Sequence, residues 1–138
     1  MCTSFKVELM QAVHNFTNGT GNTFKLALYD NSPSFTAATT AYTSSGEVAN
    51  SGTYSAGGGT LTNVTPTSSG TTAFTDFADI SFTSATITAY GALIYNDSAT
   101  GDPAVCVLDF GGAKTSTNGT FTVIFPTADS TSAIIRIA

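Results

Sequence analysis

Apolar residues recur at helical spacing near the start of the chain. They fall on one face of a helix, at Phe5, Leu9, Val13 and Phe16. The pattern predicts a helix over about 4–16, with Ser4 at its N-cap and Glu8 as an approximate capping-box partner. A helix of about three turns is marginal by itself, so we expect its apolar face to dock on the sheet or on another chain.

Beyond this helix, the chain shows the period-two alternation that is typical of β-strands. In 23–30, Phe24, Leu26 and Leu28 alternate with other residues, which predicts a half-buried strand. Further strands, each bounded by turn residues, are predicted over 60–66, 80–82, 85–96, 103–110, 119–126 and 133–138.

Three of these segments indicate how the strands are connected. Residues 85–96 carry apolar side chains on both faces in their second half, so we expect a central strand there. The turn residues of 96–102 predict a hairpin to 103–110. Phe74 and Phe77 are three residues apart, which favours a turn leading into the strand that follows them.

A long connection without strand patterning is predicted over about 31–59, where large apolar residues are few. A connection of about 30 residues is rare in a compact domain, and such loops usually serve as binding surfaces, lids or arms. We expect Tyr42, Val48 and Tyr54 to hold this loop against the rest of the chain.

Together these elements predict a mainly β fold. The expected architecture is a two-layer antiparallel β-sandwich, jelly-roll-like or immunoglobulin-like, with one short N-terminal helix. The length of 138 residues predicts one domain over 1–138.

Composition narrows the class of partner. Only 9% of the residues are charged, and Thr, Ser, Gly and Asn supply the polarity instead, which suits strands with one solvent-facing side. A net charge of −5 argues against nucleic-acid binding, because phosphate contacts need clustered Lys and Arg. No run approaches the ~18 apolar residues of a membrane span, and no signal-peptide pattern opens the chain, so synthesis and folding in a cytoplasm are expected.

Candidate catalytic residues are few. His14, the only histidine, is expected to be solvated on the helix, opposite the apolar face; any Ser-His-Asp triad or other hydrolase site would have to use it. Cys106 lies in the middle of a predicted strand, where a buried free thiol is expected. No motif supports Cys106 and His14 as a nucleophile pair, and a disulfide with Cys2 is not expected.

Carboxylates offer one alternative, a calcium site. Asp76 with Asp79 is one candidate pair, and Asp97 with Asp102 beside Asn96 is another. Neither spacing matches a known calcium loop, and turn formation explains Asn96 and Asp97 without a metal. The residues therefore predict no cofactor, no metal and no catalytic group, and the protein is expected not to be an enzyme.

A resemblance adds to this interpretation. It is carried, in chain order, by the phrases FKVELMQAVHNF, FKLALYD, SSGEVANSGTYSAGGGTLTNV, TTAFTDFADISF, YGALIYND, AVCVLDFGGAKTS and FTVIFPTADSTSAIIRIA. In these phrases and their order, over nearly its whole length, the chain resembles a family of small proteins encoded among the structural genes of tailed bacteriophages and prophages. The resemblance implies a virion component and brings no catalytic residues with it.

The role that the resemblance implies is that of a capsid decoration or cement protein on the surface of the virion. Its expected partners are the major capsid protein and copies of itself, in a homotrimer at three-fold or quasi-three-fold points of the lattice. The helix and the long loop are expected to contact these neighbours, through Phe5, Leu9, Val13, Phe16, Tyr42 and Tyr54.

A tail or fibre module that binds a host surface glycan is the alternative. Tyrosine rings could supply stacking faces for sugars, and the candidates are Tyr29, Tyr42, Tyr54 and Tyr90. Copy number separates the two roles, since decoration requires hundreds of copies per particle and a fibre only a few.

Overall fold

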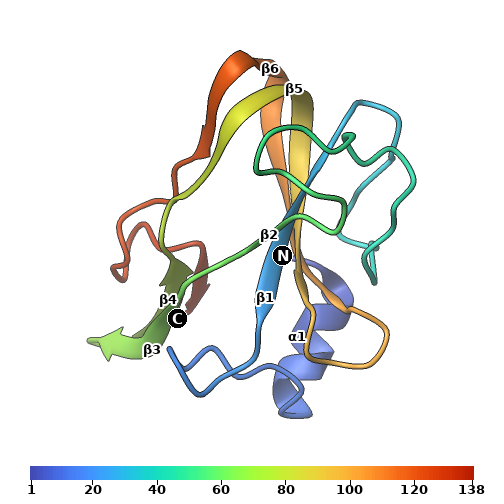
Figure 1. Ribbon diagram of the computed structural model, residues 1–138. Coiled ribbons are helices and arrows are strands. Elements are labelled where there is room, and N and C mark those ends of the chain that lie inside the picture. Colours follow the sequence, from blue (N-terminus) through green and yellow to red (C-terminus); the bar gives the residue numbers. More distant parts are fainter.

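Figure 1 shows the computed structural model, which describes all 138 residues. The chain contains α1 (Thr3–Met10), β1 (Phe24–Tyr29), β2 (Gly59–Thr60), β3 (Asn63–Ser69), β4 (Thr72–Phe77), β5 (Ile80–Asn96), β6 (Ala104–Val123) and β7 (Ile135–Ile137). The prediction of a mainly β fold with one short N-terminal helix is confirmed.

Two antiparallel sheets pack together. The larger sheet has the strand order β2-β1-β5-β6, and the smaller sheet has the order β3-β4-β7. The hairpin of β5 and β6 arches over the top of the molecule, while the smaller sheet lies at the lower left of Figure 1. The predicted hairpin is therefore confirmed, and β5 is central between β1 and β6, as its two apolar faces indicated.

The longest strand departs most from expectation. Two strands were predicted over 103–110 and 119–126, yet β6 runs as one element from Ala104 to Val123. The residues that suggested a break form irregularities within the strand instead: Gly111, Gly112 and Asn118 have positive φ angles, and the β5–β6 register shifts beside them. Such bulges bend a strand without ending it.

Smaller differences concern the neighbouring strands. The segment predicted as one strand over 60–66 divides between β2, which pairs with β1, and β3, which pairs with β4 in the other sheet. The turn expected at Phe74 and Phe77 is wrong, since both residues belong to β4. Residues 133–138 contribute only the three-residue β7, which pairs with β4.

The N-terminal helix is shorter than predicted and ends at Met10 rather than near 16. The N–H of Val13 donates to the carbonyl of Glu8, and the N–H of Ala12 donates to the carbonyl of Leu9. With Ala12 at φ 58°, this is the Schellman arrangement that satisfies the last carbonyls of a helix. The start also differs, because Cys2 occupies the N-cap position and makes no side-chain cap hydrogen bond.

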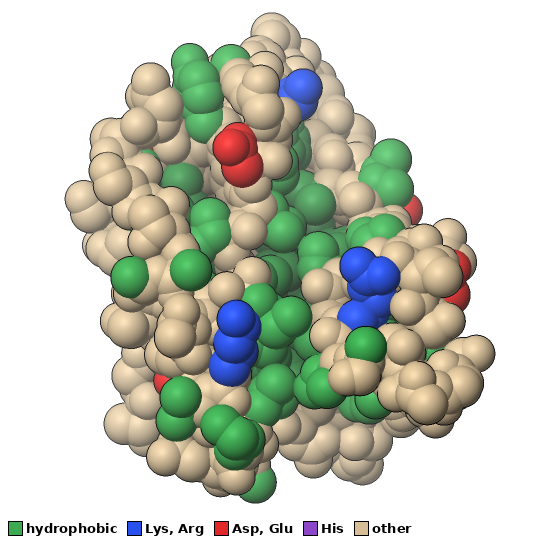
Figure 2. Space-filling model, turned by 180° about the vertical axis from the view of Figure 1, so that it is seen from behind, with side chains coloured by type: hydrophobic (Ala, Val, Ile, Leu, Met, Phe, Trp, Pro, Cys, Tyr) green, Lys and Arg blue, Asp and Glu red, His purple; other side chains and the backbone are tan.

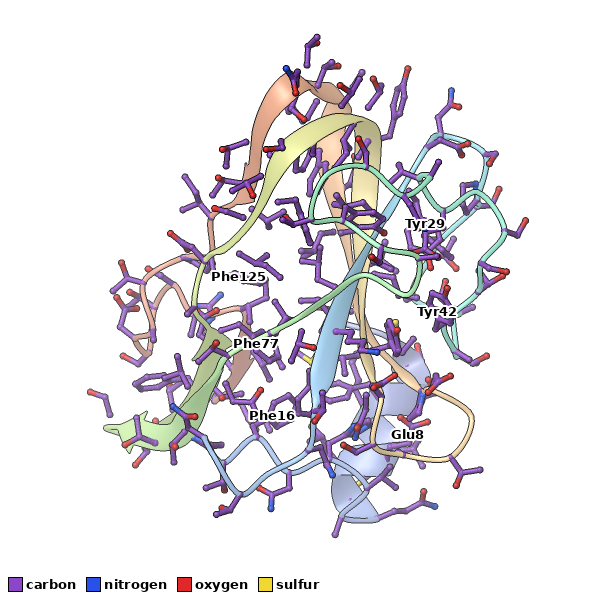
Figure 3. All side chains as sticks on the ribbon, viewed as in Figure 1. Glu8, Phe16, Tyr29, Tyr42, Phe77 and Phe125 are labelled. Atoms are coloured by element: carbon purple, nitrogen blue, oxygen red, sulfur yellow. The ribbon has the colours of Figure 1, made fainter.

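Aromatic side chains join the two sheets. Phe16, in the segment after α1, stacks on Phe24 of β1 with 4.3 Å between ring centroids and lies 6.1 Å from Phe77 of β4. Phe77 in turn lies 5.7 Å from Phe125. Figure 3 shows Phe16, Phe77 and Phe125 in a row between the elements that carry them. These rings are buried, so the core of the sandwich continues from one sheet into the other.

Candidate functional site

The helix α1 presents two different faces. Phe5 is fully buried and lies 5.0 Å from the His14 ring, so the predicted apolar face docks on the chain itself. On the opposite side, Val7 is 48% exposed and Met10 is 82% exposed. These two residues are three apart, which places them on the same side of the helix. The outward face of α1 is therefore partly apolar.

A groove adjoins the end of this helix. It has a volume of about 460 Å³ and lies between the segment that follows α1 and the smaller sheet. Its lining is mostly apolar and comprises Leu9, Ala12, His14, Asn15, Phe16, Pro66, Ala73, Phe74, Thr75, Ile135 and Ile137. Ile137 is 56% exposed at its rim. Leu9 of α1 and Ala12, two residues after its end, thus line an apolar hollow.

His14 lines this groove. It was predicted to be solvated on the helix, but this prediction is wrong, because its side chain is buried and lies beyond the end of the helix. Nε2 lies 2.8 Å from Oε2 of Glu8, and Nδ1 lies 3.0 Å from the amide nitrogen of Asn96. Because that amide nitrogen can only donate, Nδ1 accepts, and Nε2 carries the proton that it donates to Glu8. Both ring nitrogens are occupied within the chain, which makes His14 a structural link between the helix and β5.

The six residues predicted to contact partners differ in how far they are buried. Phe5, Phe16 and Tyr54 are buried in the core, so for these three the prediction of a contact surface is wrong. Leu9, Val13 and Tyr42 are half-buried. The outward pair Val7 and Met10 was not predicted, although their spacing of three, off the predicted apolar face, is visible in the sequence.

One carboxylate, that of Glu47, accepts three of the hydrogen bonds that fix the long loop. Glu47 accepts hydrogen bonds from the Tyr42 hydroxyl at 2.6 Å, the Tyr54 hydroxyl at 2.8 Å and the Gly57 N–H at 2.7 Å. The Tyr54 hydroxyl also accepts from the N–H of Leu28 in β1. The prediction that Tyr42 and Tyr54 fix this loop is confirmed, and Glu47 is the residue that the sequence did not single out.

The tyrosines around Glu47 have perturbed acidities. Burial, followed by the hydrogen bond to Glu47, raises the pKa of Tyr42 to about 12. Burial likewise raises the pKa of Tyr29, Tyr54 and Tyr95. Tyr42 also stacks on Tyr95 at 4.7 Å, and Figure 3 places Tyr29 and Tyr42 together at the base of the loop. All four phenols therefore stay neutral well above the usual pKa of tyrosine.

The cysteines behave as buried apolar residues. Cys2 and Cys106 are both free and both buried, as predicted for Cys106. Burial raises the pKa of the Cys106 thiol to about 12, so the thiol is protonated at neutral pH. A thiolate nucleophile is therefore disfavoured at this position.

Asp76 and Asp79, the carboxylates considered as one alternative calcium pair, accept hydrogen bonds from backbone groups. Asp76 is fully buried and accepts from the N–H groups of Phe77 and Ile134, while Asp79 accepts from the N–H of Phe125. Burial raises the pKa of Asp76, against the effect of its two hydrogen bonds. The structure contains no group of three or more His, Cys, Asp or Glu side chains placed to hold a metal ion.

Comparison with known proteins gives no relative. No protein-family model, no curated protein and no solved structure matches this chain. The structure also has no helix with the length and apolar character needed to cross a membrane.

Proposed function

We propose that the protein is a non-enzymatic structural component of a tailed-phage virion, a decoration protein that binds the outside of the assembled head and stabilises it. The observations that carry the proposal are the exposed apolar residues Val7 and Met10 on the outward face of α1, and the mostly apolar groove of about 460 Å³ that Leu9 of the same helix lines. Exposed apolar surface next to an apolar hollow marks an interaction site more often than a solvated face. The resemblance to phage structural proteins supports the same class.

The energetic logic depends on many copies. Covering a side chain such as Met10 contributes about 1.5–3 kcal/mol per copy, which is too little for tight binding by a single contact. A protein that binds only the assembled lattice stabilises it at every occupied site. The proposed partners are the major capsid protein and further copies of the chain, with a homotrimer as the predicted state.

The test uses the protein and the particles of the virus that encodes it. Copy number per purified particle is measured by quantitative mass spectrometry, and binding of added protein to undecorated heads by co-sedimentation. We expect hundreds of copies, and we expect Val7→Lys combined with Met10→Lys to abolish co-sedimentation. Thr117→Lys is the control, because Thr117 is an exposed polar residue of β6, outside α1 and outside the groove.

Two results would remove the proposal. One is a copy number of only a few per particle, and the other is unchanged binding by the double variant. Circular dichroism of all variants shows whether the sheets remain intact, which is expected because the substituted side chains point away from the core.

The glycan-binding alternative finds no support in the placement of its tyrosines. Tyr29 and Tyr54 are 1% exposed, and the Tyr42 ring is stacked on Tyr95. Three of the four rings considered for sugar stacking are thus engaged within the chain.

A further inference from the structure

The two sheets have four outer edges, and only one of them is long and unpaired. The edge strand β2 has two residues and β7 has three, while β3 contains Pro66 and a register shift. Proline and an irregular register hinder the pairing of a further strand at a sheet edge. By contrast β6 has 20 residues and pairs with β5 alone.

The free side of β6 is covered only at its beginning. Ala104 donates its N–H to Thr40, and Val105 accepts from the N–H of Cys2. Beyond Val105, no further backbone–backbone hydrogen bond reaches this side of the strand. A row of unpaired N–H and C=O groups is a template for an added strand.

A hollow of about 400 Å³ lies along this edge. It is lined by Phe110, Lys114, Thr115, Thr120, Phe121, Thr122, Val123 and Ile124. Successive side chains of a strand point to opposite faces, so a hollow lined by the consecutive residues 120–124 follows the edge of the strand rather than one face. Ile124 is 76% exposed there.

The charge at this hollow is positive in a protein whose net charge is −5. Lys114 is its only charged lining residue. A second hollow, of about 320 Å³, has Arg136 beside Met1 and Ile134. Neither Lys114 nor Arg136 forms an ion pair, whereas Lys25 pairs with Asp97. Figure 2 shows one face of the molecule, on which green side chains lie in a hollow between two groups of Lys or Arg side chains, with an Asp or Glu side chain above it.

We propose that the free edge of β6 at residues 119–124 binds an extended segment of a partner protein as an added strand, and that this segment alternates apolar side chains with carboxylates. The apolar side chains cover Ile124 and the hollow, and the carboxylates face Lys114. The inference deepens the proposed function, in which the partner is the shell of the virus head. A second copy pairing through the same edge fits less well, because it would bring another Lys114 and no carboxylate.

The experiment measures binding of short fluorescent peptides to the full chain by anisotropy, at peptide concentrations up to about 1 mM. In one peptide valine alternates with threonine and aspartate, and in its match lysine replaces aspartate. We expect the acidic peptide to bind more tightly, and Lys114→Glu to weaken it at least ~5-fold while favouring the basic peptide. Lys6→Glu is the control, since Lys6 is exposed and forms no ion pair, and the variant makes the same charge change away from this hollow.

Hydrogen exchange locates the bound peptide. Protection of the amides of 119–124 on addition of the acidic peptide is expected from strand addition. The proposal is overturned if neither peptide binds, if both bind equally, or if protection appears elsewhere. Particle binding is measured separately with the α1 variants. If neither peptide binds, the strand-addition proposal is wrong, while the decoration role is still decided by the particle-binding test.

Discussion

Ala12 shows how one residue sets the end of the helix. Its φ of 58° lies in the left-handed region, which costs a residue with a Cβ atom roughly 1–2 kcal/mol. The two hydrogen bonds of the Schellman arrangement hold it there, and the turn directs His14 and Phe16 into the core. Ala12 is therefore strained at a position where glycine would adopt the same φ without strain.

We expect Ala12→Gly to stabilise the protein by about 1 kcal/mol, because glycine adopts this φ without the steric cost. Urea unfolding followed by circular dichroism measures the change. Ala38→Gly is the matched control: Ala38 is also exposed but has no positive φ, so glycine there should cost a few tenths of a kcal/mol. A loss of stability in the Ala12→Gly variant would contradict the explanation of the helix end.

At the scale of elements, the long loop between β1 and β2 is fixed by hydrogen bonds to the rest of the chain, among them those from the N–H groups of Tyr42 and Val48 to the carbonyls of Asp102 and Leu28. Apart from isolated bridges such as Tyr29 with Glu47, it has no strand of its own. Among the hydrogen bonds that fix the loop, Glu47 accepts three, two from tyrosines and one from Gly57. Bonds to a charged acceptor contribute more than neutral ones, so this carboxylate is the main polar link of the loop.

Glu47→Ala is expected to destabilise the fold by about 3 kcal/mol, since it leaves the Tyr42 and Tyr54 hydroxyls without their acceptor. Chemical unfolding gives the magnitude, and limited proteolysis should show faster cleavage within 31–59. Asp30→Ala, at an exposed carboxylate at the start of the same loop, should leave the unfolding midpoint nearly unchanged. Equal protease resistance of the Glu47→Ala variant and the wild type would disprove this role.

The elements also show what the sequence can predict. Alternation in 23–30 gave β1 nearly to its ends, and the apolar residues on both faces of 85–96 identified the central strand, because burial acts directly on these patterns. The continuity of β6 was missed, since Gly111, Gly112 and Asn118 read as turn residues in a sequence. Whether such residues end a strand or form a bulge depends on the neighbouring strand, here β5. The local sequence pattern carries no information about that neighbour.

The candidate contact surface was predicted less well than the fold. A stripe of apolar residues such as Phe5 and Phe16 signals that a helix face is covered, but the same pattern arises whether the cover is the chain itself or a partner. Here the chain covers it, and the outward apolar residues are Val7 and Met10. The free edge of β6 has no sequence signature at all, because it follows from strand order.

For the whole molecule, the tyrosine cluster links stability to alkaline pH. The pKa values of Tyr29, Tyr42, Tyr54 and Tyr95 are all raised, chiefly by burial, whereas the unfolded chain ionises its phenols near pH ~10. A raised folded pKa contributes stability that is present below the unfolded value and is lost as the pH rises toward the folded one. The fold is therefore sensitive to pH above ~10.

We expect the urea midpoint to fall steeply from pH ~10 upward, toward the pKa of about 12 of Tyr42. The measurement is a series of urea titrations between pH ~8 and ~12, with absorbance of ionised tyrosine recorded in parallel. Tyr42→Phe should show a shallower decline, because one of the linked phenols is gone. A midpoint that does not change over this range would refute the linkage.

The course of the N-terminus determines when the fold can be completed during synthesis. The N–H of Cys2 donates to the carbonyl of Val105, and Phe5 is buried in a core that includes β6. A ribosome that adds about 5–20 residues per second needs roughly 5–20 seconds to go from Cys2 to Val105. Until then the first residues lack their cover, so a nascent chain stalled before β6 presents Phe5 to chaperones, and the final structure can form only after β6 has been made.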